Sequence, residues 1–117
     1  MSNIAEADNK LNEMILTGKG MDGFEEFYSH DCSMQENNGA PCLGKDANRK
    51  REHEFMTTVE AVHGGRVVAT AVSGDTSFSE WEFEMTIKGM GRVKMEQVAV
   101  RKWRDGKIVA ERFYHNP

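Results

Sequence analysis

The sequence predicts a single α+β domain in which amphipathic helices precede one curved antiparallel sheet. Three observations support this fold class. The chain has 117 residues, close to the commonest domain size, and its 38% hydrophobic and 29% charged residues are typical of a globular protein. Apolar residues recur at helical spacing in the first half and alternate with polar residues in the second half. No linker or repeat divides the chain, so we treat residues 1–117 as one domain.

Helical periodicity predicts three helices ahead of the sheet. The first spans residues 3–17, with Asn3 as its N-cap, because Asn side chains accept a hydrogen bond from the first turn. A short second helix spans about 22–29, with Asp22 as its cap. A highly charged third helix spans 45–58.

Period-two alternation predicts the strands. Between the second and third helices, residues 32–36 have the side-chain alternation of a short strand. Four long β-rich runs follow from Val59 onward. Glycine pairs such as Gly64-Gly65 are expected to separate these runs. Asp105-Gly106 is the strongest hairpin signal, because a type I′ turn needs a positive φ at both positions. In one run we expect an apolar set to be buried and an acidic set to be exposed: Trp81, Phe83 and Met85 against Glu80, Glu82 and Glu84.

The last two β-rich runs have apolar residues in both phases. Val98 and Val100 occupy one phase, whereas Met95 and Trp103 occupy the other. Either a β-bulge near Glu96-Gln97 switches the phase, or both faces of the sheet are covered. The helices can cover only one face, so the second explanation implies a partner subunit and a homodimer.

Composition excludes several classes of partner. A net charge of −4 and an isoelectric point of about 5.6 argue against nucleic-acid binding. No run approaches the roughly 18 apolar residues that a membrane span needs, and the N-terminus resembles no secretory signal. Cys32 and Cys42 form no disulfide framework, so we expect reduced thiols in a cytoplasmic protein. The four histidines show no metal-ligand spacing, and nothing predicts a metal or another cofactor.

Two segments resemble a known superfamily. The run from Phe27 to Glu36 contains an aromatic pair followed by Asp, two small residues, an apolar residue and an acid. The run from Trp103 to Val109 begins with an aromatic residue and continues as x-Asp-Gly-Lys-Ile. Both runs, and a third helix beginning near Gly44, resemble the nuclear-transport-factor-two-like superfamily, which includes the SnoaL-like polyketide cyclases and ketosteroid isomerase.

The resemblance covers nearly the whole chain and carries expectations about shape. It implies a cone in which three helices pack on the concave face of the sheet and enclose an apolar pocket. It also implies frequent homodimers formed through the sheet. Members include isomerases, cyclases, dehydratases, hydrolases and binding domains, so the fold specifies no single activity.

Glu36 is the first candidate for chemistry. Strand alternation places it on the side of Cys32 and Met34, where a desolvated carboxylate becomes a usable proton acceptor. The resemblance independently places the general base of the isomerases, an Asp, at this position. In one alternative, Glu36 ends its strand and points to water. In another it pairs with Arg51, and the site becomes an anion clamp.

Glu111 and His115 form a second candidate pair. They share a strand phase with Phe113, where a carboxylate and an imidazole could shuttle a proton. The alternative places both on an outer face near a frayed C-terminus.

The remaining isomerase apparatus is missing from the sequence. The resemblance implies a catalytic tyrosine in the first helix, but this helix has none, and the matching region lies near Asn12. The second acid that the resemblance implies falls near Ala99 or Val100. An oxyanion hole is usually the largest catalytic contribution, so we reject steroid isomerase activity.

Three functions remain open. The first is binding of a small apolar or partly polar organic ligand in an apolar pocket. The second is cofactor-free isomerase, cyclase or lyase chemistry with Glu36 as general base, and the third is a dimerisation or interaction module with a vestigial pocket. An acid–His pair within hydrogen-bonding reach favours the enzyme, whereas a lone Glu36 paired with Arg51 favours binding. The expected ligand-binding residues are Tyr28, Met34, Arg51, Phe55, Trp81, Phe83, Met85, Val98, Val100 and Phe113.

Overall fold

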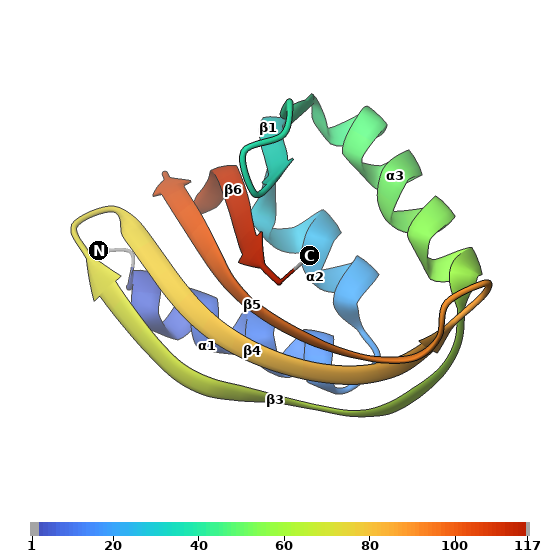
Figure 1. Cartoon of the computed structure of the whole chain (residues 1–117). Coiled ribbons are helices and arrows are strands. Elements are labelled where there is room, and N and C mark those ends of the chain that lie inside the picture. Colours follow the sequence, from blue (N-terminus) through green and yellow to red (C-terminus); the bar gives the residue numbers. More distant parts are fainter. Residues whose placement is uncertain (1–2, 117) are drawn as a thin grey trace.

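A computed structural model describes residues 3–116 and shows three helices against one curved sheet (Figure 1). The elements follow in the order α1 (Ile4–Leu16), α2 (Gly20–Phe27), β1 (Tyr28–Glu36), β2 (Cys42–Leu43), α3 (Lys45–Thr58), β3 (Val59–Ser73), β4 (Thr76–Ile87), β5 (Gly91–Arg104) and β6 (Lys107–His115).

The six strands form one open sheet in the order β2-β1-β6-β5-β4-β3. Strands β3 to β6 form the predicted antiparallel meander. The expectation of a wholly antiparallel sheet needs a correction, because β1 pairs with β6 in parallel. Side-chain alternation has the same period in parallel and antiparallel strands, so the sequence could not distinguish them.

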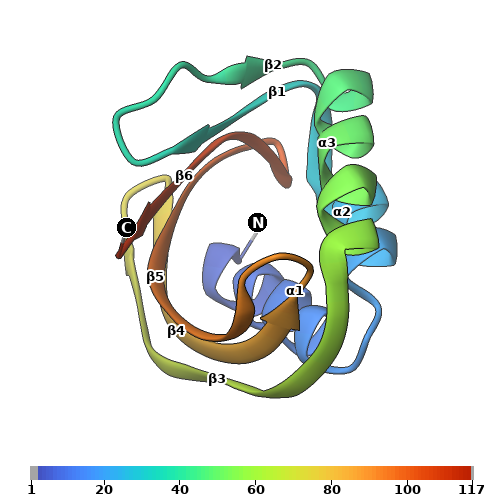
Figure 2. The same ribbon diagram turned by 45° about the vertical axis from the view of Figure 1, so that its right-hand side comes forward.

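Figure 2 shows the sheet curving around the helices, which lie on its concave side as expected. The first and third helices begin and end within a residue of their predicted bounds. Asn3 caps α1, since its Oδ1 accepts a hydrogen bond from the Glu6 N–H at 3.1 Å. The Asp22 cap is wrong, because α2 begins two residues earlier and places Asp22 inside the first turn.

Glycines at two places in the sheet allow a tight turn and a close side-chain contact. Asp105 and Gly106 both have positive φ, 54° and 78°, which confirms the predicted type I′ hairpin between β5 and β6. Gly64-Gly65 is no turn but part of β3, which runs unbroken across it. A Cβ on Gly65 would lie 2.8 Å from the Phe83 ring, so this glycine lets the ring lie against the backbone.

The phase of β4 is as predicted. Trp81 and Met85 are buried, and Phe83 on the same face is half-buried. Glu80 is exposed on the opposite face, as expected. Glu82 and Glu84 on that face are half-buried rather than exposed, and each accepts a hydrogen bond from an arginine. No register shift occurs between β4 and β5, and the shift between β5 and β6 falls at Lys102/Trp103. The first of the two explanations, a β-bulge near Glu96-Gln97, is therefore wrong, and the apolar residues of the outer phase need another explanation.

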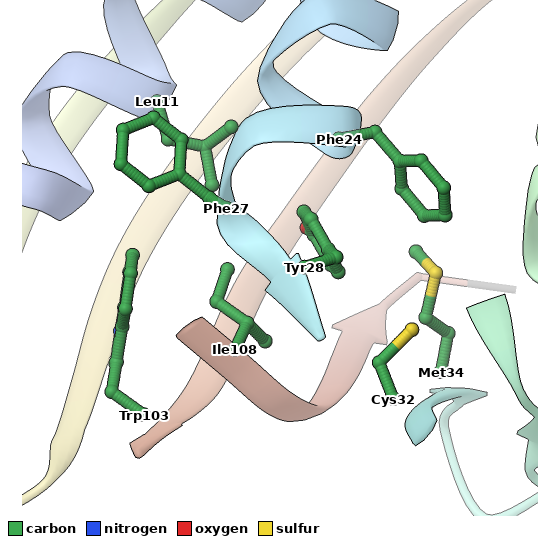
Figure 3. Close-up of a cluster of buried hydrophobic side chains, with 8 residues drawn as sticks. All are labelled: Leu11, Phe24, Phe27, Tyr28, Cys32, Met34, Trp103 and Ile108. Carbon is green, nitrogen blue, oxygen red and sulfur yellow. The ribbon is translucent and has the colours of Figure 1, made fainter. Parts of the chain in front are cut away.

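The hydrophobic core lies where α1 and α2 meet β1, β5 and β6 (Figure 3). Phe27 packs edge-on against Trp103, with ring centroids 6.0 Å apart, and Phe24 stacks on Tyr28 at 4.8 Å. The α1–α2 pair is close enough that a Cβ on Gly23 would meet Leu11 Cδ1 at 2.7 Å. Leu11 therefore fills the space between the two helices beside Gly23.

We expect Leu11→Ala to lower the free energy of unfolding by about 2–5 kcal/mol, because it opens a cavity in a closely packed core. Leu11 is 1% exposed. The matched control is Leu16→Ala at the end of the same helix, where the side chain is 45% exposed and the change should stay within about 0.5 kcal/mol. Urea denaturation of both variants measures the difference, and equal losses would contradict this account of the core.

Candidate functional site

A cavity of about 640 Å³ lies between the concave face of the sheet and the helices. Its wall is mostly apolar, with charged side chains at its inner end, at its outer end and where α1 joins α2. Eight of the ten expected ligand-binding residues line it: Tyr28, Met34, Arg51, Phe55, Trp81, Phe83, Met85 and Phe113.

Val98 and Val100 do not line the cavity. Val98 pairs with Glu80 and Val100 with Phe78, and cross-strand partners share a face. Both valines therefore lie on the outer face of the sheet, while Gln97 and Arg101 of the opposite phase face inward and line the cavity. Both phases of β5 carry apolar residues, so alternation alone could not select the inner one.

Arg101 lies at the inner end of the cavity with only 2% of its surface exposed. Its Nε donates to Glu111 Oε2 at 2.7 Å, and its Nη1 donates to both Asp8 Oδ1 and Asn12 Oδ1 at 2.7 Å. Asp8 and Asn12 lie one turn apart on α1, so the guanidinium joins α1 to β5 and β6.

Burial alone would lower the pKa of Arg101, but Glu111, Tyr28 and Asp8 raise it above its usual value. Burial and the neighbouring Glu111 raise the pKa of Tyr28 well above 10.0. Tyr28 therefore stays protonated and donates its hydroxyl to Glu111 Oε1.

Serines of β4 complete this buried network. Ser77 and Ser79 donate to the two carboxylate oxygens of Asp8, each at 2.8 Å. Asn12 Nδ2 donates to Ser79, and Trp103 Nε1 donates to Ser77, each at 2.9 Å. Each of these buried polar groups has a partner, as a stable buried network requires.

Glu36 lies at the outer end of the cavity with its side chain 50% exposed. Its Oε1 lies 3.3 Å from Arg51 Nη1, and its Oε2 lies 2.8 Å from His115 Nε2. The structure thus brings together a carboxylate from β1, a guanidinium from α3 and an imidazole from β6. The expected Glu111–His115 pair is not formed, because Glu111 points to Arg101 and Tyr28 instead.

Glu52, which lines the cavity beside Arg51, is a titratable group that the sequence did not reveal. Burial raises the pKa of its carboxyl to about 6, with smaller contributions from Glu111 and Glu36, while Arg51 opposes the shift. Arg51 Nε and Nη2 are fully buried without a hydrogen-bond partner among the described residues, although Nη2 lies 3.5 Å from Glu52 Oε1. This end of the cavity can therefore accept a proton or offer N–H donors.

One signal in the sequence indicated the inner network. Asp8 and Asn12 interrupt the apolar stripe of α1 formed by Ile4, Leu11 and Ile15. Polar residues on a buried helix face need partners, so this spacing points to a buried polar site. Glu52 gave no such signal, because it lies in a helix whose residues are mostly charged.

Both cysteines are free, and burial raises the pKa of the Cys32 thiol. Within residues 3–116, no group of three or more His, Cys, Asp or Glu side chains is placed to hold a metal ion. None of the described helices has the length and apolar character to cross a membrane.

Comparison with known proteins identifies the family. The SnoaL-like domain model matches residues 2–115, so the chain belongs to the SnoaL-like domain family. A solved structure from Mesorhizobium loti, proposed to be a SnoaL-like polyketide cyclase, is 31% identical, with a TM-score of 0.88 over 97% of this chain and 99% of that one. A search of curated proteins gave no match.

Two further solved structures share the fold at low identity. An NTF2-like protein of unknown function from Burkholderia pseudomallei has a TM-score of 0.84 at 14% identity, over 99% of this chain and 92% of that one. A Catenulispora acidiphila protein with a ketosteroid isomerase-like fold, solved with trimethylamine, has a TM-score of 0.71 at 17% identity, over 86% of this chain and 78% of that one. These confirm the nuclear-transport-factor-two-like fold that the sequence resembles.

Replacing Arg101 should destabilise the protein strongly. Arg101→Met leaves Asp8 and Glu111 without their cation, and we expect a loss of about 3–5 kcal/mol in the free energy of unfolding. Arg66→Met is the control, because Arg66 is 68% exposed and pairs with Glu82 at 2.8 Å. It should cost no more than about 1 kcal/mol. Chemical denaturation compares the two, and a small loss for Arg101→Met would show that the network contributes little.

Glu52 should make stability depend on pH. Its raised pKa means that the folded protein holds this proton more tightly than the unfolded chain between the ordinary value of 4.5 and about 6. The free energy of unfolding therefore falls as pH rises through this window. Glu52→Gln should remove the fall, with a gain above pH 6 of at most about 2 kcal/mol. Because the side chain is 31% exposed, solvent screening reduces this figure.

Denaturation of Glu52→Gln at about pH 4.5 and pH 7.5 measures the effect. Glu54→Gln is the matched control, since Glu54 lies on the same helix with its side chain 67% exposed. If both variants follow the wild-type pH profile, Glu52 is solvated and its pKa is ordinary.

Proposed function

We propose that the protein binds a small, mostly apolar organic molecule in the cavity between the helices and the sheet. The observation that carries this proposal is the cavity itself, whose volume of about 640 Å³ lies within the range of about 300–1,000 Å³ usual for ligand sites. Its apolar wall contains a few polar groups at defined places, the pattern that usually fixes a ligand's orientation.

The relatives support the proposal without specifying the ligand. The Catenulispora acidiphila neighbour was solved with trimethylamine, so a related fold has been found with a small organic molecule. We also propose a cytoplasmic location and no nucleic-acid partner, for which the net charge of −4 and the two free cysteines are the support.

Methionine methyl groups offer a test with an internal control. We expect N-phenyl-1-naphthylamine, a neutral apolar probe, to shift the methyl signals of Met34, Met85 and Met95, which line the cavity. The signal of Met90 should not move, because this residue is 68% exposed and lies outside the cavity wall. A titration of protein labelled with ¹³C at its methionine methyl groups measures both, and no shift of the three cavity methyl groups would overturn the proposal.

Proton transfer is a second candidate function, favoured by two observations. First, the structure contains an acid–His pair of the kind that favours an enzyme, because His115 Nε2 lies 2.8 Å from Glu36 Oε2. A separate carboxyl, that of Glu52, has a pKa of about 6 and lines the cavity. A base whose pKa is near the working pH combines the ionised form with useful basicity.

We expect the protein to accelerate ring opening of 5-nitrobenzisoxazole, in which a base removes the ring C–H proton and the N–O bond breaks. The rate should rise with pH through about 6, as Glu52 ionises. Glu52→Gln should lower the rate by roughly 10²–10⁴-fold, whereas Glu54→Gln should leave it unchanged. If Glu36→Gln alone abolishes the rate, Glu36 is the base. A rate no higher than that in buffer would leave binding as the function.

We also propose a homodimer formed through the outer face of the sheet. Phe78, Val98, Val100 and Tyr114 lie on this face, and no helix covers it among the described residues. Tyr114 is 45% exposed. A second copy related by two-fold symmetry would cover these side chains.

Sedimentation should give about twice the 13.2 kDa chain mass at micromolar concentration. Val100→Lys should produce monomers, because it places an unpaired charge in the proposed interface. Val62→Lys is the control, since Val62 is 67% exposed and pairs with Met85 on the opposite face. Wild-type protein that sediments as a monomer would exclude this interface.

A further inference from the structure

One nitrogen of the buried Arg101 side chain has no protein partner. Nε and Nη1 account for the three hydrogen bonds to Glu111, Asp8 and Asn12. Nη2 makes no hydrogen bond with any residue in the described range 3–116. Nη2 nevertheless keeps some accessible surface, since it is not one of the polar atoms that are both fully buried and without a partner. Since Arg101 lines the cavity and Nη2 keeps some accessible surface, we infer that the N–H groups of Nη2 face the cavity.

The guanidinium is held rigidly, so this donor is positioned in advance. Three bonds of 2.7 Å fix the planar group from α1 and from β6, and only 2% of the side chain is exposed. A donor held in this way loses little conformational entropy when it binds an acceptor. An unpaired N–H of a buried cation is costly, so a ligand oxygen here adds a strong hydrogen bond.

The charge around Arg101 determines which acceptor fits. One guanidinium faces two carboxylates, those of Asp8 and Glu111. An anionic ligand would bring a third negative group beside them in a poorly solvated place. A neutral oxygen with a lone pair meets the same N–H groups without that repulsion.

Apart from Glu111 and Gln97, the side chains that line this part of the cavity are mostly apolar. Leu11, Tyr28 and Trp81 line the cavity and are 1%, 6% and 1% exposed. The Tyr28 hydroxyl is committed to Glu111 and does not compete for the ligand. The part of a ligand next to Arg101 must therefore be apolar apart from its oxygen.

We propose that Arg101 Nη2 binds a neutral carbonyl-type oxygen at the buried end of an apolar ligand, and that this end of the cavity rejects carboxylates. The assignment rests on the proposed binding function and names the ligand class for that same cavity. Arg101 acts as the ligand's hydrogen-bond donor, while Asp8, Asn12 and Glu111 position it.

Three probes of similar shape test the assignment: 2-acetylnaphthalene, 2-isopropenylnaphthalene and 2-naphthoate. They present a carbonyl, an isosteric alkene and a carboxylate on one ring system. We expect wild-type protein to bind 2-acetylnaphthalene at least roughly tenfold more tightly than each of the other two, in calorimetric titrations. Isotope-edited infrared spectra of ¹³C-labelled 2-acetylnaphthalene should show a lower carbonyl stretching frequency in the protein than in an apolar solvent.

Glu111→Gln tests the charge argument. The amide keeps the shape of the side chain, and its oxygen can still accept from Arg101 Nε while its NH₂ group faces Tyr28. Removing one negative charge should raise the affinity for 2-naphthoate by roughly tenfold and change that for 2-acetylnaphthalene much less. If this variant does not fold, the wild-type comparison of the three probes decides alone.

The outcomes separate two failures. Equal affinity for 2-acetylnaphthalene and 2-isopropenylnaphthalene, or an unshifted carbonyl frequency, would overturn the role of Arg101 while leaving ligand binding intact. Tighter binding of 2-naphthoate by wild-type protein, or its unchanged affinity in folded Glu111→Gln, would overturn the preference for neutral ligands. Absence of binding by all three probes and by N-phenyl-1-naphthylamine would overturn the proposed function, and the assignment with it.

Discussion

The pairing of one buried cation with two carboxylates constrains the rest of this structure. Arg101 is almost inaccessible to solvent, and a buried charge is tolerated only when its partners are correctly placed. Those partners come from α1, through Asp8 and Asn12, and from β6, through Glu111. The position of the first helix over the sheet is therefore coupled to the register of the last two strands. The same contacts form the inner end of the cavity.

The two ends of the cavity consequently differ in kind. The inner end is a fixed polar network enclosed by well-packed aromatic side chains. At the outer end, Arg51 and His115 hold a half-exposed Glu36, and exposed ion pairs contribute little stability. Changes at the outer end should therefore destabilise the fold less than changes in the inner network. Asn12 of the inner network is committed to Arg101 and Ser79.

Part of the site was predictable because it follows strand periodicity. Alternation along β4 placed Trp81, Phe83 and Met85 on the cavity face, and the family resemblance drew attention to Glu36. Alternation failed for Val98, because both phases of β5 are apolar and the choice depends on pairing with β4. Strand alternation also could not show that Glu111 forms its hydrogen bond with Arg101 rather than with His115, because all three side chains lie on one face of the sheet.

The sequence by itself determined the α+β class, the three helices, the antiparallel meander and its Asp105-Gly106 hairpin. These features depend on local periodicity and on backbone conformations that few residues accept. Only the tertiary structure decided the parallel pairing of β1 with β6, the inner phase of β5 and the partners of Arg101. Those depend on contacts between residues as far apart as Asp8 and Arg101, whose geometry no local pattern encodes. The raised pKa of Glu52 is decided there too, because burial by distant elements causes it.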